Sequence, residues 1–391
     1  MLAILANFRI RDEKIAFLNS EILKNEMIII FKILKHALLL YLMFFFYGCK
    51  IDNEIVKKAI SEKIFSPRNY DHINDQPVIK IGFGSCLDQE KKMGIFESIK
   101  LTKPDMFLMI GDNVYGDARD GELRKMAVAY RTQKANFRSL ALNFPIESIW
   151  DDHDYGVNDG GSNYRHKEIA EKMFLDFWEI PPNDVRRSRA GLYRDQLLKI
   201  NNKIVQIIYL DTRFHRGKLA LSDKKSVSDK EKYIASKDKT QTMLGENQWG
   251  WLKEKLSIVV DFRLIVSSIQ FLAIGHGWEC WQMLPHERLR MMDLFDKYNL
   301  DNIVFLTGDR HRAGIYQFIT KDGNKIHEIT SSPLNASTFP GEENGPLRIG
   351  TTYTDINFGL ITINTSKNIL RGELINNSGE IINSIKVEYG H

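Results

Sequence analysis

Residues 104–117, PDMFLMIGDNVYGD, decide the fold of this chain. The apolar run at 106–110 carries no charge and lies between Pro104-Asp105 and Gly111, as expected for a strand that is buried on both faces. A glycine and an aspartate follow it directly. The same order of a short apolar run and then a polar cluster recurs along the chain, which predicts an α/β protein whose strands end at a polar edge.

Five similar apolar runs predict further buried strands, at residues 78–84, 146–150, 205–210, 264–268 and 303–306. Apolar residues at helical spacing predict helices at 93–100, 122–138, 166–178, 246–256 and 286–298. Beyond Gly314 the pattern changes to strands without long helices, at 315–320, 326–330, 359–363, 369–374 and 381–387. Alternating strands and helices with a β-rich end predict a layered α/β sandwich of two sheets, formed by one domain over residues 77–391.

Polar side chains follow each of the central strands. They include Cys86, Asp112, Tyr115, Asp152, His153, Asp211, Gln270, Asp309 and His311. In α/β sheets, ligands bind beyond the carboxyl ends of the strands, so we expect these side chains to meet at one cleft. Carboxylates held close together repel one another unless cations lie between them. Oxygen, imidazole and thiolate donors suit iron, manganese, zinc or calcium, and one aspartate per strand end suits a two-metal site acting on phosphorus.

Composition excludes several other classes of protein. The chain has 391 residues and a net charge of +4, with 27% charged and 43% hydrophobic residues, which is typical of a globular protein. The sequence has no stripe of basic residues of the kind that indicates a nucleic-acid-binding module. Its three cysteines exclude a disulfide scaffold. A lysine-rich stretch at 218–239 interrupts the pattern with seven lysines and four acids. We interpret it as a solvated surface insertion, with a mobile segment that meets an anionic substrate as the alternative.

The N-terminal part predicts export. Residues 37–48 are uncharged and apolar, and twelve residues are too few to span a bilayer comfortably. Gly48-Cys49 resembles the cleavage and lipidation point of a bacterial lipoprotein, so residues 1–49 are interpreted as a signal peptide with Cys49 as the lipidated residue, and residues 50–76 as a tether. The segment 27–49 is a complete signal by itself, which suggests a misassigned start before Met27. An uncleaved membrane anchor is the alternative, and both interpretations place the domain outside the cytoplasm, at the cell envelope.

In order and spacing, the motifs of this chain resemble the PhoD-type alkaline phosphatases, a branch of the calcineurin-like metallophosphoesterases. The resemblance covers most of residues 77–335 and rests on GSC (84–86), PDMFLMIGDNVYGD (104–117), WDDHD (150–154), SIQFL (268–272), GWECWQMLPHER (277–288), TGDRH (307–311) and TSSPLNAS (330–337). It implies an α/β/β/α sandwich of two mixed sheets flanked by helices. The chain departs from the branch at Asn113, where tyrosine is usual, and at Gly116, where an acid is usual, although Asp117 follows one residue later.

The resemblance also implies roles for single residues. Asp112 matches the carboxylate that bridges two metals, while Cys86 and Tyr115 match ligands of ferric iron. Asp152 would hold the second metal, and His153 would contact the phosphate or the leaving oxygen. The remaining expected ligands are Asn158, Gln270, Asp309 and His311, and Arg213 is a candidate to face the phosphate. The implied cofactors are Fe³⁺ with Ca²⁺, with zinc or manganese as alternatives.

Each of these residues also has a purely structural interpretation. Cys86 could form a disulfide with Cys280, since an exported chain meets an oxidising compartment. Tyr115 could be a packed core residue, and Arg213 could pair with Asp211. The remaining structural alternatives are that His153 pairs with Asp154 and that Asp151 caps a helix or turn.

The predicted function is hydrolysis of phosphomonoesters or phosphodiesters, in which a metal-bound hydroxide attacks phosphorus in line with the leaving oxygen. The substrate would be a small molecule, a phospholipid or a cell-envelope polymer, and the enzyme a monomer held at the membrane by its lipid. One alternative is a phospholipase D-like activity, for which choline would be the diagnostic product. Another is a non-catalytic envelope lipoprotein that keeps the fold, and metal content would separate it from an enzyme.

Overall fold

The computed structural model describes residues 63–223 and 232–389. The described residues from Ile64 onward form one compact unit. The predicted signal peptide, Cys49 and most of the predicted tether lie outside the described residues. Within the described part, no helix combines the length and the apolar character that crossing a bilayer requires.

The first large sheet has six strands in the order β15-β14-β13-β1-β2-β3. Strands β1, β2 and β3 run parallel, and β13, β14 and β15 extend the sheet antiparallel from β1. The bounds of these strands are β1 (Val78–Gly84), β2 (Met106–Ile110), β3 (Ile146–Ile149), β13 (Asn357–Asn364), β14 (Ile369–Asn376) and β15 (Ile381–Glu388).

The second large sheet has seven strands in the order β12-β10-β11-β9-β8-β5-β4. Strands β5, β8, β9 and β11 are parallel, while β4, β10 and β12 pair antiparallel with their neighbours. The bounds are β4 (Arg194–Ile200), β5 (Lys203–Tyr209), β8 (Phe262–Val266), β9 (Ile303–Thr307), β10 (Ala313–Ile319), β11 (Lys325–Thr330) and β12 (Arg348–Tyr353).

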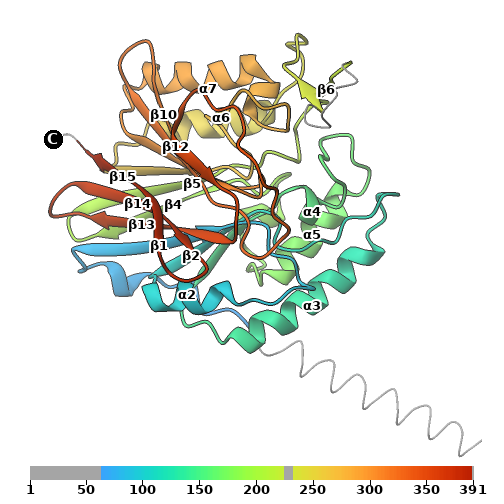
Figure 1. Ribbon diagram of the computed structural model, residues 1–391, viewed down its shortest axis with the longest axis horizontal. Helices are drawn as coiled ribbons and strands as arrows, with labels where there is room; N and C mark the ends of the chain where they lie inside the picture. Colours follow the sequence, from blue (N-terminus) through green and yellow to red (C-terminus); the bar gives the residue numbers. More distant parts are fainter. Residues whose placement is uncertain (1–62, 224–231, 390–391) are drawn as a thin grey trace, which may run out of the picture. The chain divides into compact units, whose positions relative to one another are not determined.

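Helices cover the outer faces of both sheets, as Figure 1 shows. The α-helices are α2 (Ile95–Thr102), α3 (Arg124–Leu140), α4 (Asp152–Tyr155), α5 (Lys167–Phe177), α6 (Gly245–Leu256) and α7 (Pro285–Lys297). Three short 3₁₀ helices complete the described elements, η1 (Asp71–Ile73), η2 (Val185–Arg187) and η3 (Trp281–Met283), together with the small strands β6 (Ala220–Leu221) and β7 (Tyr233–Ile234).

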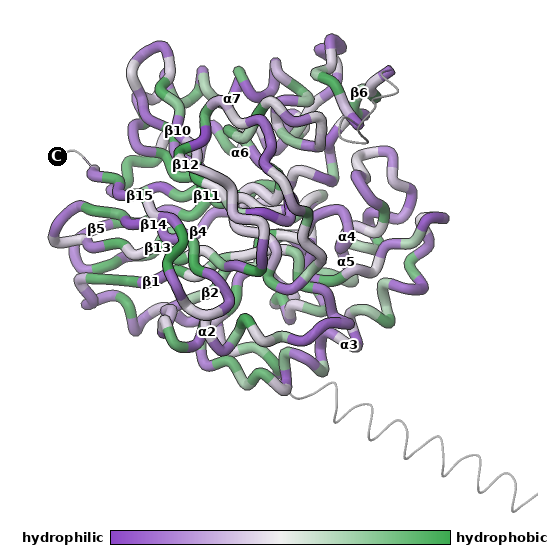
Figure 2. Tube along the Cα trace, viewed as in Figure 1, coloured by the Kyte–Doolittle hydropathy of each residue, from purple (hydrophilic) through white to green (hydrophobic). Residues whose placement is uncertain are grey.

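Alternation along the strands divides the core into three apolar layers. On β2, Phe107 and Met109 pack with the residues of α2, α3 and α5, whereas Met106 and Leu108 face the second sheet. On the second sheet, Phe305 faces the layer that α6 and α7 cover. Successive side chains of a strand point to opposite faces, so this division makes four layers, helix–sheet–sheet–helix. Figure 2 shows the corresponding pattern, with hydrophobic colour along the strands and hydrophilic colour in the outer turns. The predicted α/β/β/α sandwich is confirmed.

The folded unit begins earlier than predicted. Phe65, expected in the tether, is buried at the core, where its ring contacts those of Phe137, Phe177 and Trp178 at centroid distances of 4.8–5.8 Å. Ile73 is also buried, between the two sheets. The sequence pattern did not reveal these two residues, because Ile64-Phe65 is only an isolated apolar pair and Ile73 is a single apolar residue in polar surroundings. The first residue of the compact unit is therefore 64, where the sequence predicts 77.

Candidate metal centre

The carboxyl ends of the parallel strands of both sheets meet, and their loops carry the expected donors. Four donor residues there have left-handed backbone conformations: φ is 60° at Cys86, 50° at Asp112, 67° at Asp309 and 51° at His311. Such conformations are unfavourable for residues with a Cβ and persist only where the surrounding structure enforces them. Such a concentration at one edge is common at functional sites.

Two glycines allow the loops to approach closely. A Cβ on Gly111, whose φ is 118°, would lie 2.7 Å from the Cβ of Asp151. A Cβ on Gly308 would lie 2.6 Å from the Cβ of Ser85, on the facing sheet. Real atoms do not approach this closely, so only glycine fits at these two positions. The glycine that precedes each aspartate therefore brings its carboxylate into the shared cleft.

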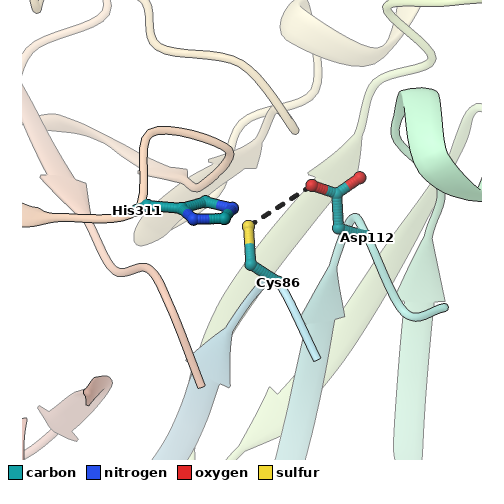
Figure 3. Close-up of side chains that lie close together, drawn as sticks. All are labelled: Cys86, Asp112 and His311. Carbon is teal, nitrogen blue, oxygen red and sulfur yellow. Dashed lines mark hydrogen bonds between the residues drawn. The ribbon is translucent and has the colours of Figure 1, made fainter. Parts of the chain in front are cut away.

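The first donor group consists of Cys86, Asp112 and His311, whose ligand atoms all lie within 4.8 Å of one another. Figure 3 shows the three side chains converging, with the sulfur between the carboxylate and the imidazole. The Cys86 Sγ lies 3.3 Å from Asp112 Oδ2, and the Tyr115 Oη lies 3.1 Å from His311 Nε2. Thiol, carboxyl, phenol and imidazole thus form one cluster from three separate loops.

A second donor group shares Asp112 with the first. It contains Asp112, Asp152 and His153, and a further group joins Asp112 and Asp152 to Asp151 and Asp309. Among the described residues, the buried Oδ1 of Asp152 and Oδ2 of Asp151 have no hydrogen-bond partner. Unpaired buried carboxylate oxygens are costly, which indicates that a cation belongs among them.

Electrostatics lead to the same conclusion. Burial, reinforced by the nearby Cys86 and other aspartates, raises the pKa of Asp112 well above its ordinary value. Burial and Asp151 likewise raise the pKa of Asp309, and burial raises the pKa of the Cys86 thiol to about 12. The ionised forms of these three groups are unfavourable because charge is concentrated away from water. A bound cation would reverse this preference, and the donor set therefore fits a pair of metal ions.

His153 has a partner that orients its ring. The His153 Nδ1 lies 2.7 Å from Asp117 Oδ1, and the Nε2 lies 4.0 Å from Asp152 Oδ1. Burial lowers the pKa of His153, but Asp152, Asp112 and Asp117 outweigh it and raise this pKa well above the ordinary value. The alternative pair with Asp154 is not formed. Asp154 instead accepts hydrogen bonds from the Asn113 and Asp151 backbone N–H groups.

Arg213 lies beneath the site rather than facing the cleft. Its guanidinium is fully buried and pairs with Asp151 at 2.5 Å and with Glu279 at 2.7 Å. Its backbone N–H donates to Asp211 Oδ1. The Arg213 guanidinium therefore neutralises two buried carboxylates. One of them, Glu279, is a site residue that the sequence analysis missed. Its only signal was an acid within the segment 277–288.

Two predicted ligands lie differently from the others. Asn158 is exposed in the loop after α4, while the next residue, Asp159, joins Asp152 and Glu279 in a fourth donor group, which is acidic. The Gln270 side chain is buried and donates to Thr330 Oγ1 at 3.0 Å, toward β11. The ligand roles of both residues remain predictions. Cys86 and Cys280 are both buried free cysteines, so the alternative disulfide is not formed.

The lysine-rich insertion reaches this loop. Residues 224–231 lie outside the described residues, but Lys232 forms an ion pair with Asp159, and the Tyr233 Oη donates to Asp159 Oδ2 at 2.8 Å. Strands β6 and β7 pair with each other across the insertion. Part of the insertion is therefore fixed beside the acidic group rather than only solvated.

The four-layer fold and its strand-end donors define a metallophosphoesterase-like protein. A sequence model of the PhoD-like phosphatases matches residues 81–365, and the chain belongs to this family. The chain is 26% identical over 318 residues to alkaline phosphatase D of Bacillus subtilis (strain 168), a match that covers 68% of this chain and 50% of that protein. The chain thus spans half the length of this relative.

Two solved structures have a similar fold. The structure of PhoD superposes with a TM-score of 0.62 at 17% identity, over 80% of this chain and 69% of that chain. A purple acid phosphatase from yellow lupin (Lupinus luteus) seeds superposes with a TM-score of 0.51 at 12% identity, over 80% of this chain and 54% of that chain. At these identities the likeness shows the fold alone.

Proposed function

We propose that this protein is a metal-dependent phosphoester hydrolase of the alkaline phosphatase D type. The observation that carries the proposal is the position of Asp112, which belongs to both donor groups. A carboxylate shared in this way can bridge two cations. Two cations a few ångströms apart are the arrangement that hydrolytic enzymes use at phosphorus.

In this proposal the two cations have different ligands. Cys86, Asp112, Tyr115 and His311 would hold one, and their thiolate, phenolate and imidazole donors suit Fe³⁺. Asp112, Asp152 and Asp309 would hold the other, and an all-carboxylate set suits Ca²⁺, with manganese or zinc as alternatives. When bound, the pair supplies Lewis-acid stabilisation of the phosphoryl charge and lowers the pKa of water.

The protein side chains supply the remaining steps. The His153 Nδ1 is held by Asp117, which leaves Nε2 directed toward the carboxylates of the centre. As an imidazolium, His153 can donate its Nε2 proton to the leaving oxygen. Arg213 keeps Asp151 and the loop after β3 in place from below. We further propose that the enzyme accepts both monoesters and diesters, and that a lipid on Cys49 holds it at the cell envelope.

Metal analysis combined with a substrate panel tests the proposal. The native protein, purified without chelators, should contain about two metal ions per chain and hydrolyse p-nitrophenyl phosphate or bis(p-nitrophenyl) phosphate. Asp112→Asn should lose metal and turnover together. Asp293→Asn, which alters an aspartate that is 67% exposed on α7, should retain both. Full metal content with no hydrolysis of any ester would contradict the function, and normal turnover in Asp112→Asn would contradict the site.

A further inference from the structure

We infer that a pocket beside the metal centre binds the nucleoside part of a phosphodiester, so that the substrate class of the proposed hydrolase includes nucleotide-containing diesters. The pocket has a volume of about 580 Å³ and lies between the loop after β8 and the loop before β12. This volume is within the usual range of small-molecule sites. The inference rests on the proposed function and names the substrate of that same site.

The pocket is adjacent to the metal centre. Arg310, which lines it, lies between Asp309 and His311 in the chain. Phe339 also lines it, and its ring stacks on the His311 imidazole with a centroid distance of 5.2 Å and an interplanar angle of 25°. The His311 Nδ1 in turn contacts the Ser337 carbonyl of the same loop. A group seated in the pocket would therefore lie next to the phosphorus held at the centre.

Two aromatic side chains give the pocket a preference for planar groups. Phe339 is 54% exposed and is the one aromatic residue among the exposed large hydrophobic residues of the described chain. Trp278 is half-buried, whereas Trp150, Trp178, Trp249 and Trp281 are buried in the core. Exposed aromatic surface next to a catalytic centre is typical of a binding site. Nucleobases stack on such side chains whatever their sequence.

The charges favour a base over a lipid chain or a polyanion. Arg310 and Arg312 both pair with Glu343, and Glu342 pairs with Arg348, which lies outside the lining, so two guanidinium groups and two carboxylates line the pocket. The Arg310 guanidinium carbon lies 5.3 Å from the centroid of the Trp278 ring. Balanced charges and polar walls suit an uncharged heterocycle. An acyl chain would need a continuous apolar wall, which these side chains interrupt.

Binding measured by titration calorimetry tests the pocket separately from turnover. The non-hydrolysable phosphonate analogue of adenosine 5′-monophosphate should bind the metal-containing protein about 10-fold or more tightly than the matching analogue of ribose 5-phosphate, because base stacking is worth about that factor. In Phe339→Ala the ratio of the two affinities should fall to a value between about 1 and about 3. Trp278→Leu should lower it in the same direction. Ile319→Ala, which removes an apolar side chain that is 55% exposed on β10, should leave the ratio unchanged.

Hydrolysis gives the second readout. The ratio of kcat/KM for thymidine 5′-(p-nitrophenyl phosphate) over methyl p-nitrophenyl phosphate should be about 10 or more and should fall by about that factor in Phe339→Ala. An unchanged ratio in both pocket variants, or an equal loss on both substrates, would overturn the inference. If the protein binds the nucleotide through its base but hydrolyses neither ester, the proposed function fails while the pocket stands. If it hydrolyses both with equal efficiency, the proposed function stands and the pocket assignment fails.

Discussion

Replacing Asp117 by asparagine should slow hydrolysis of esters that have a poor leaving group. Asp117 Oδ1 accepts a hydrogen bond from the His153 Nδ1–H at 2.7 Å, and both side chains are 20% exposed. The Tyr115 ring lies against the imidazole, at a centroid distance of 4.3 Å. Asparagine keeps an oxygen at this position but removes the negative charge. The imidazolium form of His153 therefore loses a stabilising partner while the geometry is preserved.

The magnitude follows from the kind of bond that is lost. A hydrogen bond to a charged group contributes about 1.5–3 kcal/mol, about twice the value of a neutral one. Asparagine should then cost about 1–2 kcal/mol, or about a 5- to 30-fold loss in kcat/KM. The loss of the charge also lowers the pKa of His153, which Asp152, Asp112 and Asp117 together raise against the effect of burial. Because the protonated form is the active acid, the alkaline limb of the pH–rate profile should move to lower pH.

The assay compares kcat/KM for a p-nitrophenyl ester with that for an alkyl ester. Only the alkoxide needs a proton to leave, so the loss should appear on the alkyl ester and be small on the aryl ester. Asp120→Asn, which changes a 57% exposed aspartate in the same loop, serves as the control. His153→Asn should cost more, and the double variant should be no slower than His153→Asn alone. Equal losses on both esters, or additive losses in the double variant, would refute the role of the pair.

Three further substitutions test the stability of the fold, the first beside the site and the other two elsewhere. Arg213→Met should lower the free energy of unfolding by about 3–5 kcal/mol, because it leaves Asp151 and Glu279 as unpaired buried carboxylates; a variant of wild-type stability in denaturant titration would show that the pairs matter little. Phe65→Ala should cost about 3–5 kcal/mol in the same measurement, and a loss below about 1 kcal/mol would place residue 65 outside the core. Burial lowers the pKa of His327 to about 4, so the neutral ring contributes stability above pH 6.5 that is lost as pH falls toward 4. Between pH 6.5 and pH 4, the free energy of unfolding of His327→Gln should fall by up to about 3 kcal/mol less than that of the wild type. Parallel curves of unfolding free energy against pH for the two proteins would contradict an origin in His327.

The buried central strands could be predicted from sequence because their signal is local. The predicted bounds of β1 and β2 agree with the structure, since each is a short apolar run enclosed by polar residues or glycine. Both faces of β2 are covered along its whole length, and those of β1 from Ile81 onward, so little alternation interrupts the pattern. Helix α6 was also found within one residue at its start. In α6 the signal is instead the helical spacing of its buried residues Trp249, Leu252 and Leu256.

The edge strands β4 and β12 could not be predicted in this way. In β4 (Arg194–Ile200) charged and exposed residues alternate with a few buried ones, and most of β12 is exposed or only partly buried. Each has its backbone partner on one side, and the register with that partner determines the strand. A strand that is stabilised mainly by backbone pairing with its neighbour shows little hydrophobic pattern in its own sequence.

The site shows the same division between local and distant information. Donors that directly follow a strand were predictable, because the strand end determines where they lie. The pairing of His153 with Asp117 and of Arg213 with Glu279 depends on loops that meet only in the fold, 36 and 66 residues apart in sequence. The residues that hold the donors in place are therefore the ones that sequence reasoning misses.

The donors themselves are unfavourable for folding, and this connects the geometry to the proposed chemistry. Asp112 combines a left-handed backbone with a buried carboxyl whose pKa is raised. Cys86 combines the same backbone with a buried thiol, and Asp309 repeats the combination from the other sheet. Each such residue costs about 1–3 kcal/mol in backbone strain alone, before its desolvation. A fold retains them at one edge only if a ligand that binds the native state stabilises that state in return. The proposed pair of cations would do so through the same carboxylates and thiolate that make the site unfavourable without them.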